Sequence, residues 1–527
     1  MGNNRKNDLL KELSAYLLLA AAFCLLCVFL NRYCDRLINA DASSELVMGK
    51  CLAEEGRLLS ENFHYSTELR VFDSNLIWMP LFRIMSNWHL VRVIGSIFFY
   101  IILIGCLFAL CAAAGLRKEF PFLATLWLLP FSWGYFFNVL SCVFYVLPHA
   151  TVAAALAMLF ADLSDRRAPR AAALAGGVLL AFLSGLNSVR MAITLYLPLA
   201  LAILLAIGLN PSLGREGRRL FRISCLLLGA TLVGWLINFK ILSLRYSYST
   251  YDEIWFVPFD IMRLEAAINA WLFNLGYQGG SAFSSALAFC AEAGALAVLS
   301  LYSVIVIIRH REAFSLPRQV TAYFFLSSLL LTLLIFALTN MQLSDRYMLT
   351  AAAFAFFPIF ICFSNRGVFI REECGKRILL GLMLLCCAVS LLQYRAVART
   401  DYTAANREAA DFLVAAGYRN GYATFWNANL TTELSNGDIE FWSWLDGTVM
   451  GPETVYPWLQ KKSHDTEHPE GKVCMLLSEY EVQNNRERLK GFSEEDIVFR
   501  STQEVENVGH LLVWGFDSYD AFAAAFS

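Results

Sequence analysis

The chain has 527 residues, of which 57% are hydrophobic and only 16% are charged, whereas soluble domains carry roughly 25% charged residues. This composition, with a mean hydropathy of +0.51, excludes an ordinary water-soluble globular protein and favours many membrane spans. A formal net charge of -2 without a basic domain excludes a nucleic-acid binder, because phosphate contacts require a basic surface.

Apolar segments long enough to cross a bilayer as helices recur eleven times along the chain. The first covers 14–31 and follows a basic start. We interpret it as an uncleaved span, because the cleavage-like triplet Ala40-Asp41-Ala42 lies too far beyond it. The others are predicted at 90–116, 120–137, 144–161, 171–187, 191–209, 223–242, 284–308, 319–340, 348–364 and 378–394.

Lysines and arginines gather in alternate loops between these spans, so the positive-inside rule places those loops and the N-terminus in the cytoplasm. Eleven crossings then place the residues after about 394 outside the cell, together with the long first loop, 32–89. We therefore expect any chemistry on the extracytoplasmic side. The basic loops contain Arg117 and Lys118; Arg166, Arg167 and Arg170; Arg215, Arg218, Arg219 and Arg222; Arg309, Arg311 and Arg318; and Arg366, Arg371, Lys376 and Arg377.

The composition changes after Arg395, where apolar runs give way to alternating segments. A helical pattern covers 406–416, and strand-like runs cover 421–426, 439–444, 472–477, 496–500 and 510–515. We predict an α-helical polytopic membrane protein with two domains: a transmembrane domain at 1–394 that includes the catalytic first outer loop 32–89, and a small extracytoplasmic α/β domain at 395–527.

The first outer loop carries the candidate catalytic groups Asp41, Glu45, His64 and Asp73. Asp41 precedes apolar residues at helical spacing, which predicts an amphipathic helix along the membrane surface. A carboxylate there could take a proton from an acceptor hydroxyl, although Asp41 could instead be the N-cap of a helix over 43–50.

Two outer arginines are candidates for binding a phosphate. Arg346, followed by Tyr347, lies in a short outer loop where the positive-inside rule disfavours a cation, and a guanidinium grips a phosphate with two hydrogen bonds. Arg190 lies at an outer helix end. The alternatives are an ion pair between Arg346 and Asp345, and snorkelling of Arg190 to lipid headgroups.

Aromatic and imidazole groups on the outer side are candidates for contacting a substrate. Tyr145 and His149 lie near the outer end of a span, and Trp78 and Trp426 lie in the first loop and the tail. Their rings could pack on the C–H faces of a sugar, whereas the structural alternatives are an interface anchor for Tyr145 and a core role for a lone histidine.

These features resemble the GT-C superfamily of membrane glycosyltransferases, in the branch with protein mannosyltransferases, the aminoarabinose transferase of lipid A and the Rgt-type lipopolysaccharide glycosyltransferases. The resemblance rests on Asp41 with its following helical segment, on Pro80-Leu81 before the second span, and on Arg346-Tyr347. It implies that Asp41 is the catalytic carboxylate and that Arg346 and Tyr347 hold the donor. Relatives commonly have Asp-Glu at the first site, where this chain has Asp41-Ala42.

The tail around Trp426 is similar to the extracytoplasmic tails of bacterial GT-C-like proteins, which implies a bacterial cell-membrane protein. The expected function is transfer of a sugar from a polyprenyl-phosphate donor to an extracytoplasmic glycan, lipid or protein acceptor. No sequence motif implies a metal or another cofactor, and a divalent metal stays open. The alternatives are a lipid-linked sugar flippase or exporter and a catalytically silent glycan-binding relative.

Overall fold

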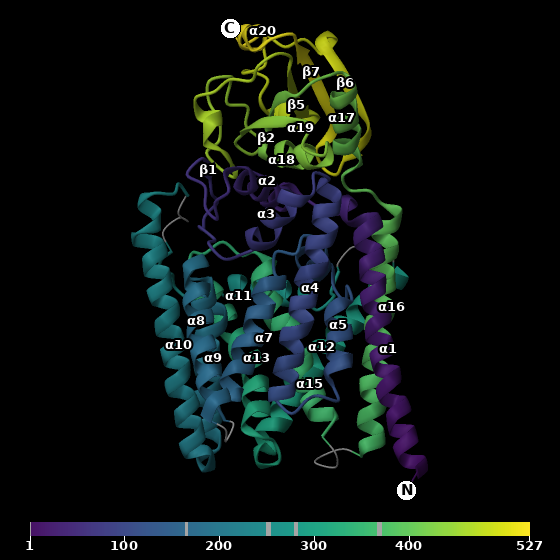
Figure 1. Cartoon of the computed structure of the whole chain (residues 1–527). Helices are drawn as coiled ribbons and strands as arrows, with labels where there is room; N and C mark the ends of the chain where they lie inside the picture. Colours follow the sequence, from purple (N-terminus) through teal and green to yellow (C-terminus); the bar gives the residue numbers. More distant parts are fainter. Residues whose placement is uncertain (1, 164–166, 249–253, 279–282, 366–370, 527) are drawn as a thin grey trace. The chain divides into compact units, whose positions relative to one another are not determined.

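The computed structural model describes residues 2–163, 167–248, 254–278, 283–365 and 371–526. The chain divides into two compact units. Figure 1 shows the chain with colours that follow the sequence. The helical unit comprises Met1–Phe29, Phe99–Phe239 and Tyr251–Ala396. The sheet unit comprises Leu30–Phe98, Lys240–Thr250 and Val397–Ser527. The first loop therefore folds with the tail, although the sequence-based division grouped it with the spans.

The helical unit is that of a multi-pass membrane protein. Within the described residues, nine helices are long and apolar enough to cross a membrane, or ten if one bent pair is a single span. The helices that contribute to this unit are α1 (Gly2–Tyr33), α4 (Trp88–Ala113), α5 (Phe120–Leu128), α6 (Trp133–Tyr135), α7 (Val146–Ala161), α8 (Arg167–Asn187), α9 (Leu197–Leu209), α10 (Gly214–Lys240), α11 (Ile261–Asn274), α12 (Phe283–Arg309), α13 (Leu316–Leu338), α14 (Leu349–Phe354), α15 (Phe356–Phe363) and α16 (Glu372–Arg399).

The predicted count of eleven spans is not confirmed, and both differences lie between residues 120 and 161. The predicted span 120–137 is bent by 82° between α5 and α6, where Pro130 offers no backbone N–H and restricts the residue before it. The predicted span 144–161 becomes α7, whose 16 residues reach only about 24 Å against a hydrocarbon core of about 30 Å. Arg166 and Arg366 of the basic loops lie outside the described residues.

The sheet unit is built on a five-stranded sheet with the order β3-β2-β5-β7-β6. The first three of these strands are parallel, and β7 and β6 are antiparallel to their neighbours. The bounds are β2 (Asn420–Thr424), β3 (Glu440–Trp444), β5 (Val473–Ser478), β6 (Ile497–Val505) and β7 (Gly509–Phe516). The strand predicted at 421–426 ends early, because α18 (Phe425–Leu434) begins directly after β2.

Both faces of this sheet are covered, because successive strand residues point to opposite sides. Ala423 and Leu476 belong to the core under α17 (Ala404–Ala415), whereas Tyr422 and Met475 belong to an aromatic core on the other face. Two short helices, α19 (Glu479–Asn484) and α20 (Tyr519–Ala524), complete the tail.

The first loop adds α2 (Ala40–Glu55) and α3 (Asn75–Ile84) to the sheet unit, and β1 (Phe63–His64) pairs with β4 (Gln460–Lys461). Nine of the sixteen residues of α2 are buried, two serines among them, and its place along a membrane surface stays a prediction. Its apolar residues pack within the unit, against α3 and α18. At Gly49, a Cβ would lie 2.6 Å from Cβ of Trp78 on α3, so a side chain there would force the two helices apart.

Candidate functional site

The helix that carries Asp41 begins one residue before it. Asn39 is the N-cap, and its side-chain oxygen accepts a hydrogen bond from the backbone N–H of Ala42 at 3.1 Å. Asp41 is therefore a first-turn residue rather than the cap. Asp41 and Glu45 are four residues apart, which places them on the same side of α2, and both are half-buried.

Arg70 joins Glu45 to two further carboxylates of the first loop. The guanidinium nitrogens of Arg70 lie 3.3 Å from Oε1 of Glu45, 3.7 Å from Oε2 of Glu68 and 3.4 Å from Oδ2 of Asp73. We call Asp41, Glu45, Glu68, Arg70 and Asp73 the acid cluster. The sequence shows Glu68 and Arg70 as charges of the first outer loop, three charges falling within residues 68–73, but they were not among the candidate catalytic residues.

Glu45 of the acid cluster has an altered titration. Burial raises its pKa from 4.5 to about 7, with Asp73 adding to the rise and Arg70 opposing it. A carboxyl that titrates near neutral pH is suited to taking up or giving up a proton in a reaction. The acid cluster therefore has the chemistry of a general acid or base.

A buried ion pair fixes the turn of α2 that bears Asp41. Arg92 and Glu433 are bonded through two pairs of atoms, with Nη2 of Arg92 2.6 Å from Oε2 of Glu433, and their side chains are 1% and 3% exposed. Arg92 Nη2 also donates to the backbone oxygen of Ala42 at 3.1 Å. Two residues further along, Asn429 of α18 donates to Oγ of Ser44 at 2.8 Å. Arg92, paired with Glu433 of α18, and Asn429 thus anchor the residues that directly follow the candidate base.

In the helical unit, two further arginines contact residues near Arg346. Arg190 lies over the ring of Tyr347, with 5.6 Å between the guanidinium carbon and the ring centroid. Arg263, which sequence reasoning missed, donates to the backbone oxygens of Phe336 and Met341 at 2.9 and 2.6 Å. Nε of Arg346 is buried without a hydrogen-bond partner among the described residues. We call Arg190, Arg263, Arg346 and Tyr347 the arginine cluster.

Three of the predicted substrate-contacting residues are buried. Trp78 is 0% exposed and packs between α2 and α4. In the helical unit, His149 is fully buried beside Trp127, with 5.7 Å between ring centroids, and its Nδ1 lies 2.6 Å from the backbone oxygen of Tyr145. Tyr145 is also buried. A substrate would reach these side chains only if the core rearranged.

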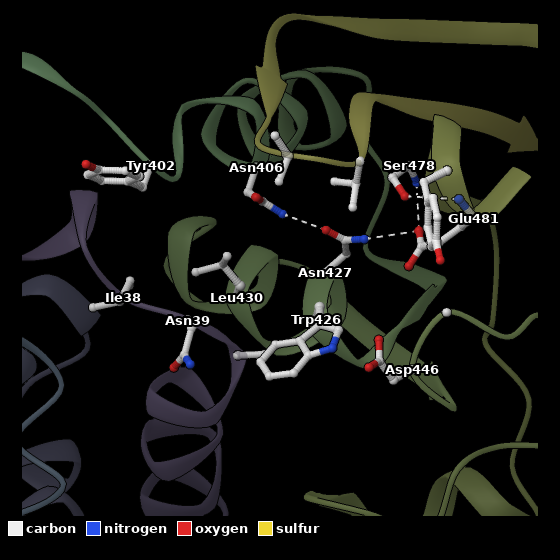
Figure 2. A pocket seen from close by; sticks show the side chains of 15 residues that line it. Ile38, Asn39, Tyr402, Asn406, Trp426, Asn427, Leu430, Asp446, Ser478 and Glu481 are labelled. Carbon is white, nitrogen blue, oxygen red and sulfur yellow. Dashed lines mark hydrogen bonds between the residues drawn. The ribbon is translucent and has the colours of Figure 1, made fainter. Parts of the chain in front are cut away.

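The two remaining candidates have distinct surroundings. His64 lies in β1, and its Nε2 is 2.8 Å from Oδ2 of Asp465, which gives it a structural role near the β1–β4 ladder. Trp426 is 42% exposed on α18 and lines a pocket, shown in Figure 2.

Cys34, Asp35 and His89 form a group whose geometry could hold a metal ion, with ligand atoms within 4.8 Å of one another. Those atoms already bond one another, because the thiol of Cys34 donates to Asp35 at 3.3 Å and His89 Nδ1 lies 2.7 Å from Asp35. A zinc site would need the thiolate and a neutral imidazole. The arrangement fits an internal hydrogen-bond network better than a metal centre.

Comparison with known proteins gives no relatives: no model of a protein family matches the chain, and no curated protein sequence matches it.

Proposed function

We propose that the chain is a membrane glycosyltransferase that moves a sugar from a polyprenyl-phosphate donor to an extracytoplasmic glycan, lipid or protein acceptor. The observation that carries this proposal is the acid cluster, in which Asp41 shares one side of α2 with Glu45, whose pKa is raised to about 7. Glu45 can therefore exchange a proton near neutral pH beside Asp41, which we propose as the general base. The basic loops of the sequence support a cytoplasmic N-terminus and an extracytoplasmic sheet unit.

In the proposed reaction, the acceptor hydroxyl oxygen forms a bond to the anomeric carbon, and the bond from that carbon to the phosphate oxygen breaks. Asp41 takes the hydroxyl proton, and polyprenyl phosphate leaves with the bonding electron pair. In the acid cluster, three carboxylates surround the single guanidinium of Arg70. This excess of acidic groups favours uptake of a proton.

The arginine cluster is the proposed binding site for the donor phosphate. Guanidinium groups pair with phosphate oxygens through two parallel hydrogen bonds, and the partnerless Nε of Arg346 leaves a donor available. Replacing Arg346 by Gln is expected to weaken binding of polyprenyl phosphate by the full-length protein. Arg318→Gln is the matched control, because the guanidinium of Arg318 donates to the backbone oxygens of Ala114 and Gly115, away from the arginine cluster.

The test of the transferase uses the purified full chain in lipid nanodiscs, a panel of polyprenyl-phosphate sugars and a crude cell-envelope extract as acceptor. Wild type should release sugar from a donor, and Asp41→Asn should lower the rate at least about 100-fold. Glu54→Gln is the matched control, because Glu54 is an exposed carboxylate on the same helix that pairs with Lys50 and lies outside the acid cluster. Failure of wild type on every donor, or full activity of Asp41→Asn, would refute the proposal.

A transporter of lipid-linked sugars is the second candidate, and one side chain favours it. Glu292 lies inside the candidate span Ser285–Arg309 and is 0% exposed, and an ionisable group within a span often marks a transport pathway. Movement of labelled donor across vesicles by wild type but not by Glu292→Gln, without sugar release, would support this candidate instead.

A further inference from the structure

A pocket of about 350 Å³ lies in the sheet unit, on the edge where the parallel strands end. Trp426 and Asn427 follow β2, and Asp446 follows β3. Ser478 is the last residue of β5, and Glu481 follows it. Figure 2 shows these side chains around one opening. None of them belongs to the acid cluster or to the arginine cluster.

The strand order explains why a pocket forms at this place. From β2 the chain continues to β3 on one side, whereas β5 pairs with β2 on the other side. The connections therefore leave neighbouring strands in opposite directions between β2 and β5. In open α/β sheets this switch point leaves a crevice beyond the carboxyl ends of the strands, and ligands bind there.

A chain of hydrogen bonds makes the polar floor of the pocket. Asn406 donates to Oδ1 of Asn427 at 3.1 Å, and Asn427 donates to Oε2 of Glu481 at 3.3 Å. Glu481 also accepts from the backbone N–H of Ser478 at 2.7 Å and from the hydroxyl of Thr424. These buried bonds fix the amides before any ligand arrives, so binding would cost little side-chain entropy.

Trp426 is the one exposed residue of α18. Eight of the other nine residues are buried and the ninth is half-buried, whereas the Trp426 side chain is 42% exposed. Packing within the unit therefore does not account for a tryptophan at this position. An accessible indole beside fixed amides is a surface on which the C–H face of a sugar ring packs.

The charge of the pocket selects among ligands. Its lining contains the carboxylates of Asp446 and Glu481 and no lysine or arginine, and burial raises the pKa of Glu481. A phosphate or nucleotide would meet no cation there, whereas hydroxyl groups can donate to carboxylates and amide oxygens and accept from amide N–H groups.

We infer that this pocket binds an uncharged saccharide unit, with its ring against Trp426 and its hydroxyl groups toward Asn406, Asn427 and Asp446. Assignment of that saccharide to the acceptor glycan rests on the proposed function, and the binding itself does not. The pocket would then hold a part of the acceptor other than the reacting hydroxyl.

The test measures binding by the full-length protein in nanodiscs, with saturation-transfer NMR and calorimetry. The probes are the methyl glycosides of hexoses, pentoses, deoxyhexoses and N-acetylhexosamines, with glucose 1-phosphate as the anionic comparison. At least one methyl glycoside should bind with millimolar affinity or better, and glucose 1-phosphate should bind more weakly. Absence of binding by all methyl glycosides, or tighter binding of glucose 1-phosphate, would overturn the inference.

Variants identify the pocket as the place of binding. Trp426→Ala should weaken binding about tenfold or more, and Trp426→Tyr, which keeps an aromatic face, should retain most of it. Trp255→Ala is the matched control, because Trp255 is 57% exposed and belongs to the helical unit. Unchanged binding by Trp426→Ala would refute the site. Asp41→Asn should bind as wild type does, which separates a failed transferase from a failed binding site.

Discussion

Removing the carboxylate of Glu433 should leave the guanidinium of Arg92 without the carboxylate that pairs with it inside the sheet unit. The two side chains are 3% and 1% exposed, and two pairs of nitrogen and oxygen atoms join them. Arg92 also donates to the backbone oxygen of Ala42, and its charge acts on the carboxylate of Asp35. Glu433→Gln preserves the size of the side chain, so its effect reports the lost charge rather than a cavity.

The expected cost follows from the burial of the pair. Breaking a buried ion pair by removing one partner destabilises a protein by about 3–5 kcal/mol, because the remaining charge stays desolvated. Replacing both partners by apolar residues of similar size is often neutral or stabilising. Glu433→Gln should therefore lower the free energy of unfolding by about 3 kcal/mol, and Arg92→Met/Glu433→Met should recover most of that loss.

Urea unfolding of the full-length protein in detergent, followed by near-UV circular dichroism and by protease cleavage within the sheet unit, measures these free energies. Glu487→Gln is the matched control, because Glu487 is exposed on the same unit, and it should change stability by less than about 0.5 kcal/mol. If Glu433→Gln costs under about 1 kcal/mol, or if the two Met substitutions are additive, the buried charges of Arg92 and Glu433 do not depend on each other for stability.

Three further predictions concern single side chains of the sheet unit. Burial raises the pKa of Glu45 from 4.5 to about 7, so the free energy of unfolding should fall by about 3 kcal/mol as pH rises between these two values. Urea unfolding at a series of pH values measures this fall, and Glu45→Gln should remove it. For Glu440, burial favours a higher pKa, but the hydrogen bond from His464 and the charge of Lys461 outweigh it and lower the pKa to about 2. Stability from Glu440 should be present above pH 4.5 and be lost as pH falls toward 2, so an acid titration that is equally steep for Glu440→Gln would contradict the assignment. At Gly95, a Cβ would lie 2.0 Å from Cζ3 of Trp78, and Gly95→Ala should destabilise by at least about 1–3 kcal/mol in thermal unfolding; an unchanged midpoint would show that the packing there is loose.

The sequence by itself predicted the helical unit well, because a helix that crosses a bilayer satisfies its backbone within one segment and its apolar composition is a local property. Nine predicted spans coincide with apolar helices. The errors fell at 120–161, where Pro130 bends an almost continuous apolar run and no change in composition marks the break. The strands of the tail were also predictable, since each alternates or is apolar over its own length.

The acid cluster was only partly predictable. Asp41, Glu45 and Asp73 stood out as charges in an outer loop, but the burial that tunes Glu45 depends on where α2 packs. Its covering helix α18 lies far along the chain, and Arg92 and Glu433, which fix α2, are 341 positions apart. Hydropathy within a window cannot report a contact of that range, so the sequence predicted an amphipathic helix along the membrane surface but not its packing against α18.

Tertiary structure alone decided which aromatic side chains a ligand can reach. Trp78 and Trp426 both follow polar stretches, yet Trp78 is 0% exposed and Trp426 is 42% exposed. The difference arises because Gly49 and Gly95 let two helices close over Trp78, whereas Trp426 follows a strand that ends at a switch point of the sheet. Local composition determined what could cross a membrane and what could form strands, and long-range packing determined which polar groups meet, because burial and charge pairing are properties of neighbours in space.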